Sequence, residues 1–556
     1  MAKKKSKEKS HGYPHLYIKE LLFNDNSNLS LNERSIVVFV GANNCGKSQI
    51  LKDIENAVSY PESDDFIVLR KAKIKTKGCF DNPVFLSRCF KKQENGNVIS
   101  FSSDISYDLE SLVEEWNKKD MCSIIPSLFM KRISTEDRLS ISNACSRESD
   151  KIPEPFYVLH DNNMIMNEIS DLFYLAFGEE LILNKSNISN LSLHIGKIPD
   201  KSQYSLDNID DFWEKVSCLP RLQDQGDGMR SFASLIIDAF TSDYSITLID
   251  EPEAFLHPPQ SRLLGKMLVD NNRNKRQLFI STHSEDFLQG ILDANCENVT
   301  IVRIDRHETI NRINILSRKS INEFWDNPIL RYTNILNGIF HEKVIVCESD
   351  YDCLFYHAIV DSICQESSIN PPDILFTHCG GKDRMKDIVK ALKSVGVQVA
   401  VICDFDIILD SRSFKKLAES FGIDWDNALS LYMKTVYDMI NSAKNKDIKN
   451  NLKKMGKIAL SGEAPSSYEA VEKICSEAGL FIVPVGEMEG FDRTVNKEKK
   501  EWVYTLLKQY DLLKEPKLND AKCFVKEVID WKQNDIEKTE VEIRKTGKKK
   551  KREVAG

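Results

Sequence analysis

The chain has 556 residues, a formal net charge of −8 and 41% hydrophobic residues. This length exceeds what one hydrophobic core usually supports, so two or three domains are expected. No uninterrupted apolar stretch approaches the length of a membrane span, which excludes a helical integral membrane protein. The lysine-rich start is not followed by an apolar core and a cleavage site. It is therefore not a secretory signal, and we expect a cytoplasmic location.

The cysteines and the basic ends point to no specific chemistry. The 14 cysteines are scattered without paired Cys-x-x-Cys spacing, which in a reducing compartment is typical of small buried side chains. The lysine-rich run at 548–552 is compatible with two roles. It would either contact nucleic-acid phosphates or form part of a solvated, disordered tail over 536–556.

A phosphate-binding motif follows the apolar run at 36–40. The octapeptide GANNCGKS occupies 41–48 and precedes a helical stretch that begins near Gln49. In such motifs the backbone curls around the phosphates, the lysine places its charge on the β and γ phosphates, and the serine hydroxyl ligates Mg²⁺. The motif predicts a nucleoside triphosphate site with contacts from Gly41, Asn43, Asn44, Gly46, Lys47 and Ser48.

The stretch from about residue 60 to residue 220 gives mixed strand and helix signals. It lacks the sustained heptads that a long coiled coil needs. We therefore expect a compact insertion that helps dimerisation. Within it, Arg138 is predicted to be an exposed, salt-bridged side chain, with a position near the nucleotide as the alternative.

An acidic pair ends a second apolar strand. Asp250 and Glu251 directly follow residues 245–249. Asp250 would hold the Mg²⁺ that Ser48 touches, and Glu251 would polarise the attacking water. The next predicted strand is followed by His283, whose imidazole would donate a hydrogen bond to the γ-phosphate.

A glycine-rich turn opens a helix upstream of the acidic pair. Gly226 and Gly228 lie at its start, and the free N–H groups of a helix N-terminus bind anions. With the phosphate loop, the acidic pair and the histidine, this turn resembles the signature of ABC-type ATPase heads of the SMC, Rad50 and RecF branch. The resemblance implies a homodimer with ATP at its interface. The signature departs from the usual Leu-Ser-Gly-Gly-Gln, because Gly226, Asp227 and Met229 replace its serine, first glycine and glutamine.

A new pattern of strands and helices begins after the predicted ATPase domain, 1–325, and a linker over 326–340. Apolar strands alternate with amphipathic helices from Val344 to Val485. Alternation of this kind predicts an α/β unit with a parallel sheet, whose ligands gather at the carboxyl ends of the strands. We place this domain over 341–535.

Acidic residues follow three of these strands. Hard oxygen ligands suit Mg²⁺ or Mn²⁺, and two such ions activate water and stabilise the leaving oxygen of a phosphodiester. The pattern favours nuclease chemistry over surface acidity at solvent-facing strand ends. The acidic residues are Glu348 and Asp352 after the first strand, Asp404 and Asp406 after the third, and Glu487 and Glu489 after the last.

Glu348 and the Asp404-Phe405-Asp406 segment, with the intervening βαβ units, resemble the TOPRIM domain of topoisomerases, primases and some nucleases. A TOPRIM domain after an ABC-type ATPase resembles the OLD (overcoming lysogenisation defect) family, which includes the Gabija nuclease and retron-associated nucleases of anti-phage defence. The resemblance implies a lysine that supports catalysis, Lys522 or alternatively Lys526. It implies metal ligands at Glu348, Asp352, Asp404, Asp406 and Glu489, with Glu487 as the alternative to Glu489.

Two smaller features accompany the predicted TOPRIM domain. Ser349 stands where the family usually has glycine, which is expected to change the turn more than the metal site. The segment Gly380-Gly381-Lys382 opens a helix and is a candidate contact for a DNA phosphate.

The leading hypothesis is an ATP-regulated, metal-dependent DNA endonuclease or nickase that acts in phage defence. Its cofactors would be ATP and Mg²⁺ or Mn²⁺, and its partners DNA, a second copy and a defence protein such as a helicase or a retron reverse transcriptase with its RNA–DNA. The alternative is a DNA-clamping ATPase of repair with a non-catalytic TOPRIM domain. A topoisomerase-like strand passer would need a tyrosine nucleophile on a separate domain, and Tyr504 and Tyr510 are expected to pack in a helix.

Overall fold

The computed structural model divides the chain into two compact units, Met1–Ile321 and Asn322–Gly556. The lysine-rich start, the predicted basic tail over 536–556 and residues 326–335 of the predicted linker lie outside the described residues. The described residues are 12–60, 63, 65–94, 96–100, 105–119, 124–144, 155–186, 190–204, 208–272, 276–307, 310–316, 336–442 and 447–532.

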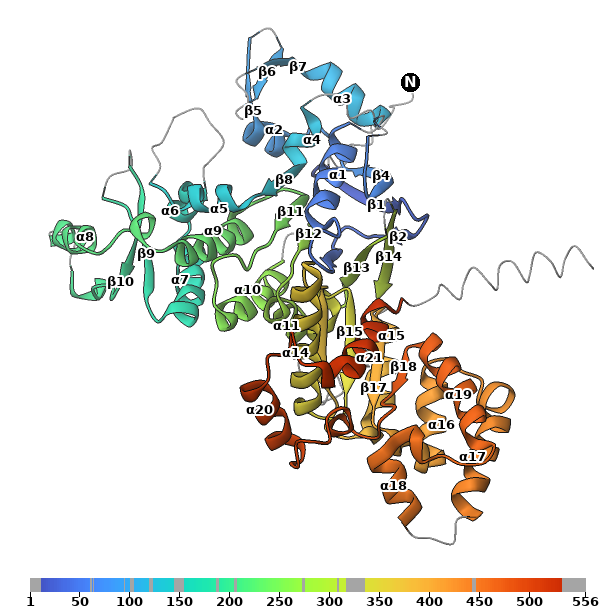
Figure 1. Cartoon of the computed structure of the whole chain (residues 1–556). Helices are drawn as coiled ribbons and strands as arrows, with labels where there is room; N and C mark the ends of the chain where they lie inside the picture. Colours follow the sequence, from blue (N-terminus) through green and yellow to red (C-terminus); the bar gives the residue numbers. More distant parts are fainter. Residues whose placement is uncertain are drawn as a thin grey trace, which may run out of the picture. The chain divides into compact units, whose positions relative to one another are not determined.

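A six-stranded sheet forms the centre of the first unit (Figure 1). Its order is β14-β13-β3-β12-β11-β8, and all neighbours are parallel except β13 and β14. Every residue of β3 and β12 is buried, as expected of strands covered on both faces. The strands are β3 (Ile36–Val40), β8 (Met130–Ile133), β11 (Ile246–Asp250), β12 (Gln277–Ser281), β13 (Val299–His307) and β14 (Ile310–Leu316).

Helices connect these strands and supply the second layer. Helix α1 packs against β11 and β12, and α10 packs against α11 and α9. The apolar residues of α1 at positions 50, 51, 54 and 58 are all buried, because this spacing places them on one helical face. The helices are α1 (Lys47–Ser59), α9 (Asp227–Thr241), α10 (Pro258–Asp270) and α11 (Glu285–Asp293).

A three-stranded antiparallel sheet, in the order β2-β1-β4, packs beside the central sheet. Its strands are β1 (His15–Phe23), β2 (Asn28–Ser30) and β4 (Leu69–Lys77). The buried Gln277 side chain joins the two sheets, because its amide accepts from the Ile18 N–H at 2.8 Å and donates to the Ile18 carbonyl at 2.7 Å. Strand β4 thus belongs to the body of the first unit.

The stretch predicted as an insertion contains short elements in its described residues. Its longest helix there is α7, of 15 residues, in keeping with the lack of heptads. One part departs from the prediction: β8 pairs in parallel with β11 and forms the edge of the central sheet. The other elements are α2 (Pro83–Cys89), β5 (Phe90–Lys92), β6 (Asn97–Ser100), β7 (Ser106–Asp108), α3 (Leu109–Lys118), α4 (Ile125–Phe129), α5 (Thr135–Ile141), α6 (Pro155–Asp161), α7 (Asn163–Phe177), β9 (Glu180–Asn184), β10 (Ser192–Gly196) and α8 (Ile209–Ser217).

The second unit is built on a four-stranded sheet in the order β16-β15-β17-β18, with every neighbour parallel. This sheet confirms the predicted α/β class. Helices α14, α20 and α21 bury apolar side chains in one cluster with β15, β17 and β18. The elements are β15 (Lys343–Cys347), α14 (Asp350–Ser367), β16 (Ile374–His378), α15 (Met385–Ser394), β17 (Gln398–Cys403), β18 (Leu480–Ile482), α20 (Lys499–Gln509) and α21 (Asn519–Asp530).

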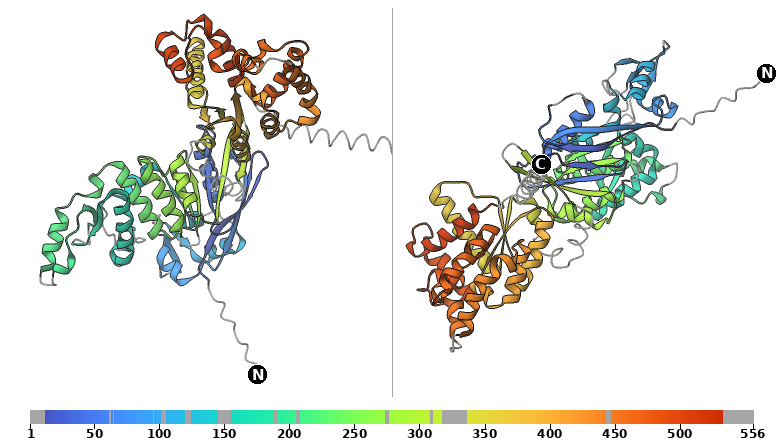
Figure 2. Two further views of the ribbon diagram at one scale, coloured as in Figure 1. Left: turned by 90° about the horizontal axis from the view of Figure 1, so that it is seen from below. Right: turned by 90° about the vertical axis from the view of Figure 1, so that its right-hand side faces the viewer.

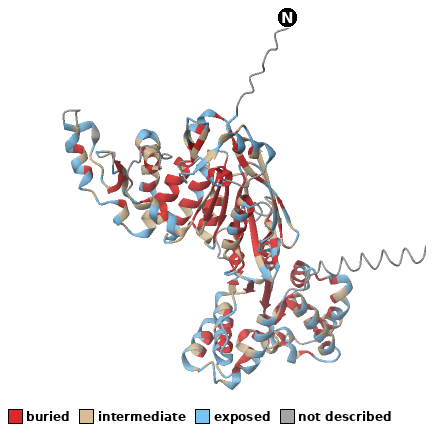
Figure 3. Ribbon diagram, turned by 90° about the horizontal axis from the view of Figure 1, so that it is seen from above, coloured by how far each residue is buried: buried red, intermediate tan, exposed pale blue. Residues whose placement is uncertain are grey.

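A helical segment separates β17 from β18 in the chain. Its helices, orange in Figures 1 and 2, gather beside the edge strand β18, against which α19 packs. Buried residues line the strands of both sheets (Figure 3). No helix among the described residues is long and apolar enough to cross a bilayer. The helices of the segment are α16 (Ser411–Ser420), α17 (Ser430–Ser442), α18 (Asp447–Met455) and α19 (Ala464–Ala478).

Candidate active sites

The phosphate loop lies between β3 and α1 and is shaped by glycines in the left-handed region. Gly41 has φ +145°, and Gly46, which caps α1, has φ +108°. A Cβ on Gly41 would lie 2.2 Å from the carbonyl oxygen of Ile304 on β13, so only glycine fits there. Asn44, at φ +60°, is the third left-handed residue of the loop.

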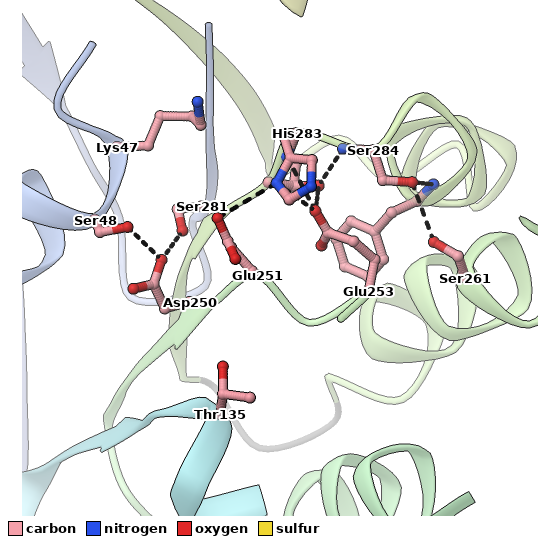
Figure 4. A network of polar contacts seen from close by, with 12 residues as sticks. Lys47, Ser48, Thr135, Asp250, Glu251, Glu253, Ser261, Ser281, His283 and Ser284 are labelled. Carbon is pink, nitrogen blue, oxygen red and sulfur yellow. Dashed lines mark hydrogen bonds and ion pairs between the residues drawn. The ribbon is translucent and has the colours of Figure 1, made fainter. Parts of the chain in front are cut away.

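Lys47 and Ser48 stand at the start of α1, opposite the end of β11 (Figure 4). The Lys47 ammonium is buried and donates to the carbonyls of Gly41 and Ala42 at 2.9 and 2.8 Å. The Ser48 hydroxyl donates to Asp250 Oδ1 at 3.0 Å. The two residues predicted to share a Mg²⁺ therefore lie in direct contact, 202 positions apart in the chain.

Strand β12 completes this acidic end of the sheet. The Ser281 hydroxyl, which the sequence reasoning did not single out, also donates to Asp250 (Figure 4). Ser281 pairs with Asp250 in the β11–β12 register. Its position at the end of an apolar strand is the feature of the sequence that could have predicted this role.

His283 lies between two glutamates (Figure 4). Its Nδ1 is 3.3 Å from Glu251 Oε1 and 3.5 Å from Glu253 Oε1. Glu253 Oε1 also accepts from the His283 N–H at 3.0 Å and the Thr282 hydroxyl at 2.8 Å. Burial raises the pKa of the Glu253 carboxyl. Glu253 is thus a further member of this site, and it holds the histidine beside the half-exposed Glu251.

Arg138 is fully buried, so its prediction as an exposed, salt-bridged side chain is wrong. Its guanidinium donates to the carbonyls of Asp250 and Glu251 at 3.0 Å each, and to the Thr135 hydroxyl at 2.9 Å. Burial lowers its pKa. The alternative, a position near the nucleotide-binding elements, agrees with this placement, because Arg138 holds the backbone of the acidic pair.

The glycine-rich turn lies at the N-terminus of α9, where Gly226 is the capping residue. A Cβ on Gly226 would meet no atom within 4 Å, whereas a Cβ on Gly228 would lie 2.6 Å from the carbonyl oxygen of Phe255. Gly228 is thus required by packing within the unit. Contact of this turn with ATP on a second copy stays a prediction.

In the second unit, four predicted acidic residues gather at the carboxyl edge of the sheet. Glu348 follows β15, Asp352 lies in the first turn of α14, and Asp404 and Asp406 follow β17. Parallel pairing of β15 with β17 brings the ends of these strands side by side.

The proximity of these carboxylates shows in their acidities. Burial, followed by the charges of Asp406 and Asp352, raises the pKa of Glu348 to about 7. Burial, followed by the charge of Glu348, raises the pKa of Asp404 well above its usual range. The Oε1 atom of Glu348 is buried and has no hydrogen-bond partner within the described structure. Raised pKa values of this kind are expected where buried carboxylates lie close to one another.

Ser349 and Asp352 form a capping box at the start of α14. The Asp352 carboxylate accepts from the backbone N–H and the hydroxyl of Ser349, each at 2.9 Å. The serine at this position therefore orients Asp352 in addition to shaping the turn. Burial raises the pKa of Asp352 despite these bonds.

The two glutamates after β18 differ in their surroundings. The charge of Glu487 raises the pKa of Asp404 and of Asp352, in each case behind the effect of burial. The Glu489 carboxylate instead accepts from the Lys499 N–H at 2.6 Å. We therefore propose Glu487, the predicted alternative to Glu489, as the ligand, and the choice between the two stays a prediction.

Lys522 lies elsewhere, and its assignment to the site is corrected. Its ammonium is 2.9 Å from Glu366, near the C-terminus of α14, and also donates to the Leu513 carbonyl. Asp352 lies at the opposite end of that helix, about 21 Å away at 1.5 Å per residue. The alternative, Lys526, is exposed on the next turn of α21.

Two other lysines contact the acidic edge. Lys382, from the predicted Gly380-Gly381-Lys382 segment, lies 3.3 Å from Asp406. Lys453, from α18, lies 3.1 Å from Glu487. Lys453 was missed because it belongs to a helix far from any strand end in the sequence.

The donor set fits a hard divalent cation. It consists of carboxylates, one of which has a buried oxygen without a partner, and carboxylate oxygens are the preferred ligands of Mg²⁺ and Mn²⁺. Within the described ranges, no three His, Cys, Asp or Glu side chains already converge as in a formed metal cage. Side-chain rotations would therefore accompany metal binding.

The two sites define the class of protein: an ABC-type ATPase head, followed by a TOPRIM domain. Residues 36–288 match the family described as an AAA domain, putative AbiEii toxin, type IV toxin–antitoxin system. Residues 339–406 match the TOPRIM domain of overcoming lysogenization defect protein-like proteins. The two matches together make the chain similar to the ATPase–TOPRIM proteins of the OLD family.

Individual relatives are more distant. The Old nuclease of Escherichia phage P2 is 22% identical over 280 residues, which are 46% of this chain and 45% of that protein. The match thus spans less than half the length of this relative. An SMC head bound to the C-terminal winged-helix domain of ScpA covers 55% of this chain and 99% of its own, at 14% identity and TM-score 0.34. The SMC head of Thermotoga maritima covers 54% and 98%, at 10% identity and TM-score 0.26.

Proposed function

We propose that the chain is a divalent-metal-dependent DNA endonuclease or nickase. The observation that carries this proposal is the set of carboxylates at one edge of the parallel sheet, with a buried, unpartnered oxygen on Glu348. Mg²⁺ or Mn²⁺, when bound, would activate water and stabilise the leaving oxygen. The water oxygen bonds to phosphorus, the phosphodiester P–O bond breaks, and the leaving oxygen takes up a proton.

In this reaction, different residues would bind the cation, orient a carboxylate and contact the DNA. Glu348, Asp404 and Asp406 would hold the cation, and the capping box with Ser349 orients Asp352. Lys382, next to Asp406, is placed to contact a DNA phosphate. The relative from phage P2 is described as a nuclease, which supports the same reaction class.

The first unit would bind and hydrolyse ATP and thereby regulate cleavage. The Lys47 ammonium, which donates to its own loop, would turn to the β and γ phosphates. Ser48 and Asp250, which lie in contact, would share a Mg²⁺, and Glu251 would polarise water, with His283 beside it. We further propose that two copies close on ATP through the Gly226–Gly228 turn, and that the protein serves in anti-phage defence, as its family resemblance to Gabija and retron-associated nucleases suggests.

A plasmid cleavage assay tests the nuclease proposal. Supercoiled DNA is incubated with Mg²⁺ or Mn²⁺, with and without ATP, and nicked and linear products are quantified. Cleavage by the unmodified chain and its loss in Glu348→Ala and Asp404→Ala support the proposal. Cleavage that both variants retain would overturn it. Absence of cleavage together with ATP-dependent DNA retention would instead indicate a DNA-clamping ATPase.

A further inference from the structure

The helical segment between β17 and β18 delivers a lysine to the acidic edge. Lys453, near the C-terminus of α18, lies 3.1 Å from Glu487 and is 45% exposed. Its hydrogen bond with Glu487 and the charge of that residue raise its pKa, and the charges of Asp406 and Asp404 act in the same direction. The ammonium therefore lies within the field of Glu487 and of the two aspartates after β17.

Backbone contacts fix α18 against the turn that carries Glu487. A Cβ on Gly456 would lie 2.1 Å from the carbonyl oxygen of Pro484, and a Cβ on Gly486 would lie 2.3 Å from the carbonyl oxygen of Lys453. The Lys457 N–H donates to the Pro484 carbonyl at 2.9 Å. The position of α18 thus depends on glycines and backbone bonds, and it does not require the Lys453 side chain.

The same turn is tied to the central acidic segment. The Phe405 N–H, between Asp404 and Asp406, donates to the Gly486 carbonyl at 2.8 Å. Backbone hydrogen bonds thus connect the three segments that carry Lys453, Glu487 and the two aspartates. This connection places a positive charge next to carboxylates that would repel a phosphodiester.

We propose that Lys453 binds a phosphate oxygen of the nucleic-acid substrate and positions Glu487 at the carboxylate cluster. This inference rests on the proposed nuclease function. An ammonium at a partly exposed edge of the site neutralises phosphate charge as the substrate approaches and stabilises the charge that develops when the P–O bond breaks. Lys382, paired with Asp406, supplies a second cation from a different element.

Lys457 provides a matched control on the same segment. Its ammonium is 3.0 Å from Glu472 of α19, so it also forms an ion pair with a glutamate. Its 45% exposure equals that of Lys453. Replacement of its side chain leaves its backbone bond to Pro484 intact. The two lysines therefore differ in what they face: the acidic edge in one case, and another helix in the other.

The experiment compares Lys453→Ala, Lys453→Arg, Lys457→Ala and Asp404→Ala in the full chain. Plasmid cleavage with Mn²⁺ gives kcat and KM, and binding of a fluorescent DNA duplex in Ca²⁺ is measured over a range of salt concentrations. We expect Lys453→Ala to lower kcat on the order of 100-fold. It should also reduce the slope of log K against log salt by about one. Lys453→Arg should retain most of the kcat and most of the salt slope. The kcat of Lys457→Ala should stay within about threefold of that of the unmodified chain.

The outcomes separate this inference from the proposed function. If Lys453→Ala matches Lys457→Ala in kcat and salt slope while Asp404→Ala is inactive, the role of Lys453 is refuted and the nuclease proposal stands. If Asp404→Ala cuts at the normal rate, the nuclease proposal itself fails. Should Lys453→Ala melt at a lower temperature than Lys457→Ala, Lys453→Arg decides: retained cleavage supports the inference, and lost cleavage overturns it.

Discussion

The carboxylates of the two candidate sites differ in what surrounds them. In the first unit, Asp250 accepts hydrogen bonds from the hydroxyls of Ser48 on α1 and of Ser281 on the neighbouring strand β12. In the second unit, Glu348 and Asp404 face mainly other carboxylates, and an oxygen of Glu348 has no partner within the described structure. The first site is hydrogen-bonded by its own residues, whereas the second holds charge repulsion that a bound cation would relieve.

The largest effect should come from the carboxylates of the second unit. We expect Asp404→Asn to reduce DNA cleavage at least about 1000-fold, because the group is central to the cluster. Glu487→Gln should also impair cleavage. Glu489→Gln is the matched control, since Glu489 faces the Lys499 N–H, and it should cut normally. A plasmid assay checks the series, and loss of activity in Glu489→Gln but not in Glu487→Gln would reverse our choice between them.

The first unit should depend on Arg138 for stability. Arg138→Ala leaves the carbonyls of Asp250 and Glu251 without their donor. It should lower the free energy of opening around β11 by about 3 kcal/mol. Hydrogen exchange of the β11 amides measures this change. Arg34→Ala, at an exposed position, is the control and should leave exchange unchanged. Equal protection in the two variants would show that Arg138 does not hold the acidic pair.

Lys47→Ala and Glu251→Gln should separate ATP binding from turnover. Without the Lys47 ammonium, binding of the triphosphate should be lost. Glu251→Gln should retain ATP and hydrolyse it about 100-fold more slowly, because the polarising carboxylate is gone. Filter binding and phosphate release measure the two steps. Normal binding and hydrolysis in both variants would refute the assignment of this site.

A smaller effect should appear in the pH dependence of the stability of the second unit. The pKa of Glu348 is about 7 in the folded chain, above its ordinary value of 4.5, so the folded state holds an extra proton between these values. Stability is full below the lower value and is lost as pH rises through the upper one. Glu348→Gln should therefore stabilise β15 by on the order of 2 kcal/mol at about pH 8 and by less at about pH 4.

Hydrogen exchange at the two pH values checks this prediction. Glu469→Gln, which removes an exposed carboxylate from α19, is the control and should show no such pH dependence. Mg²⁺ should protect β15 in the unmodified chain more at the higher pH, since it replaces the proton. An equal effect of Glu348→Gln at both pH values would contradict the crowded-carboxylate description.

Much of the fold and part of each site followed from local patterns. The apolar run at 36–40 and the glycines after it predict a strand and a phosphate loop by themselves, because glycine is the residue that adopts left-handed backbone without steric cost. The apolar runs before Glu348 and Asp404 likewise predicted where those two strands end. The choice between Glu487 and Glu489 was not, because both follow the same strand and only the path of the turn decides which one faces the cluster.

The sequence by itself determined the class of the chain: its motifs and alternating strands establish an ATPase head joined to a TOPRIM domain, since each motif is local and its chemistry needs specific residue types. Tertiary structure decided the membership of each site. In the folded chain, Arg138 is buried and donates to the Asp250 carbonyl, Lys522 pairs with Glu366 near the C-terminus of α14, and Lys453 pairs with Glu487. These contacts join residues far apart in the chain, and packing alone fixes which of them meet.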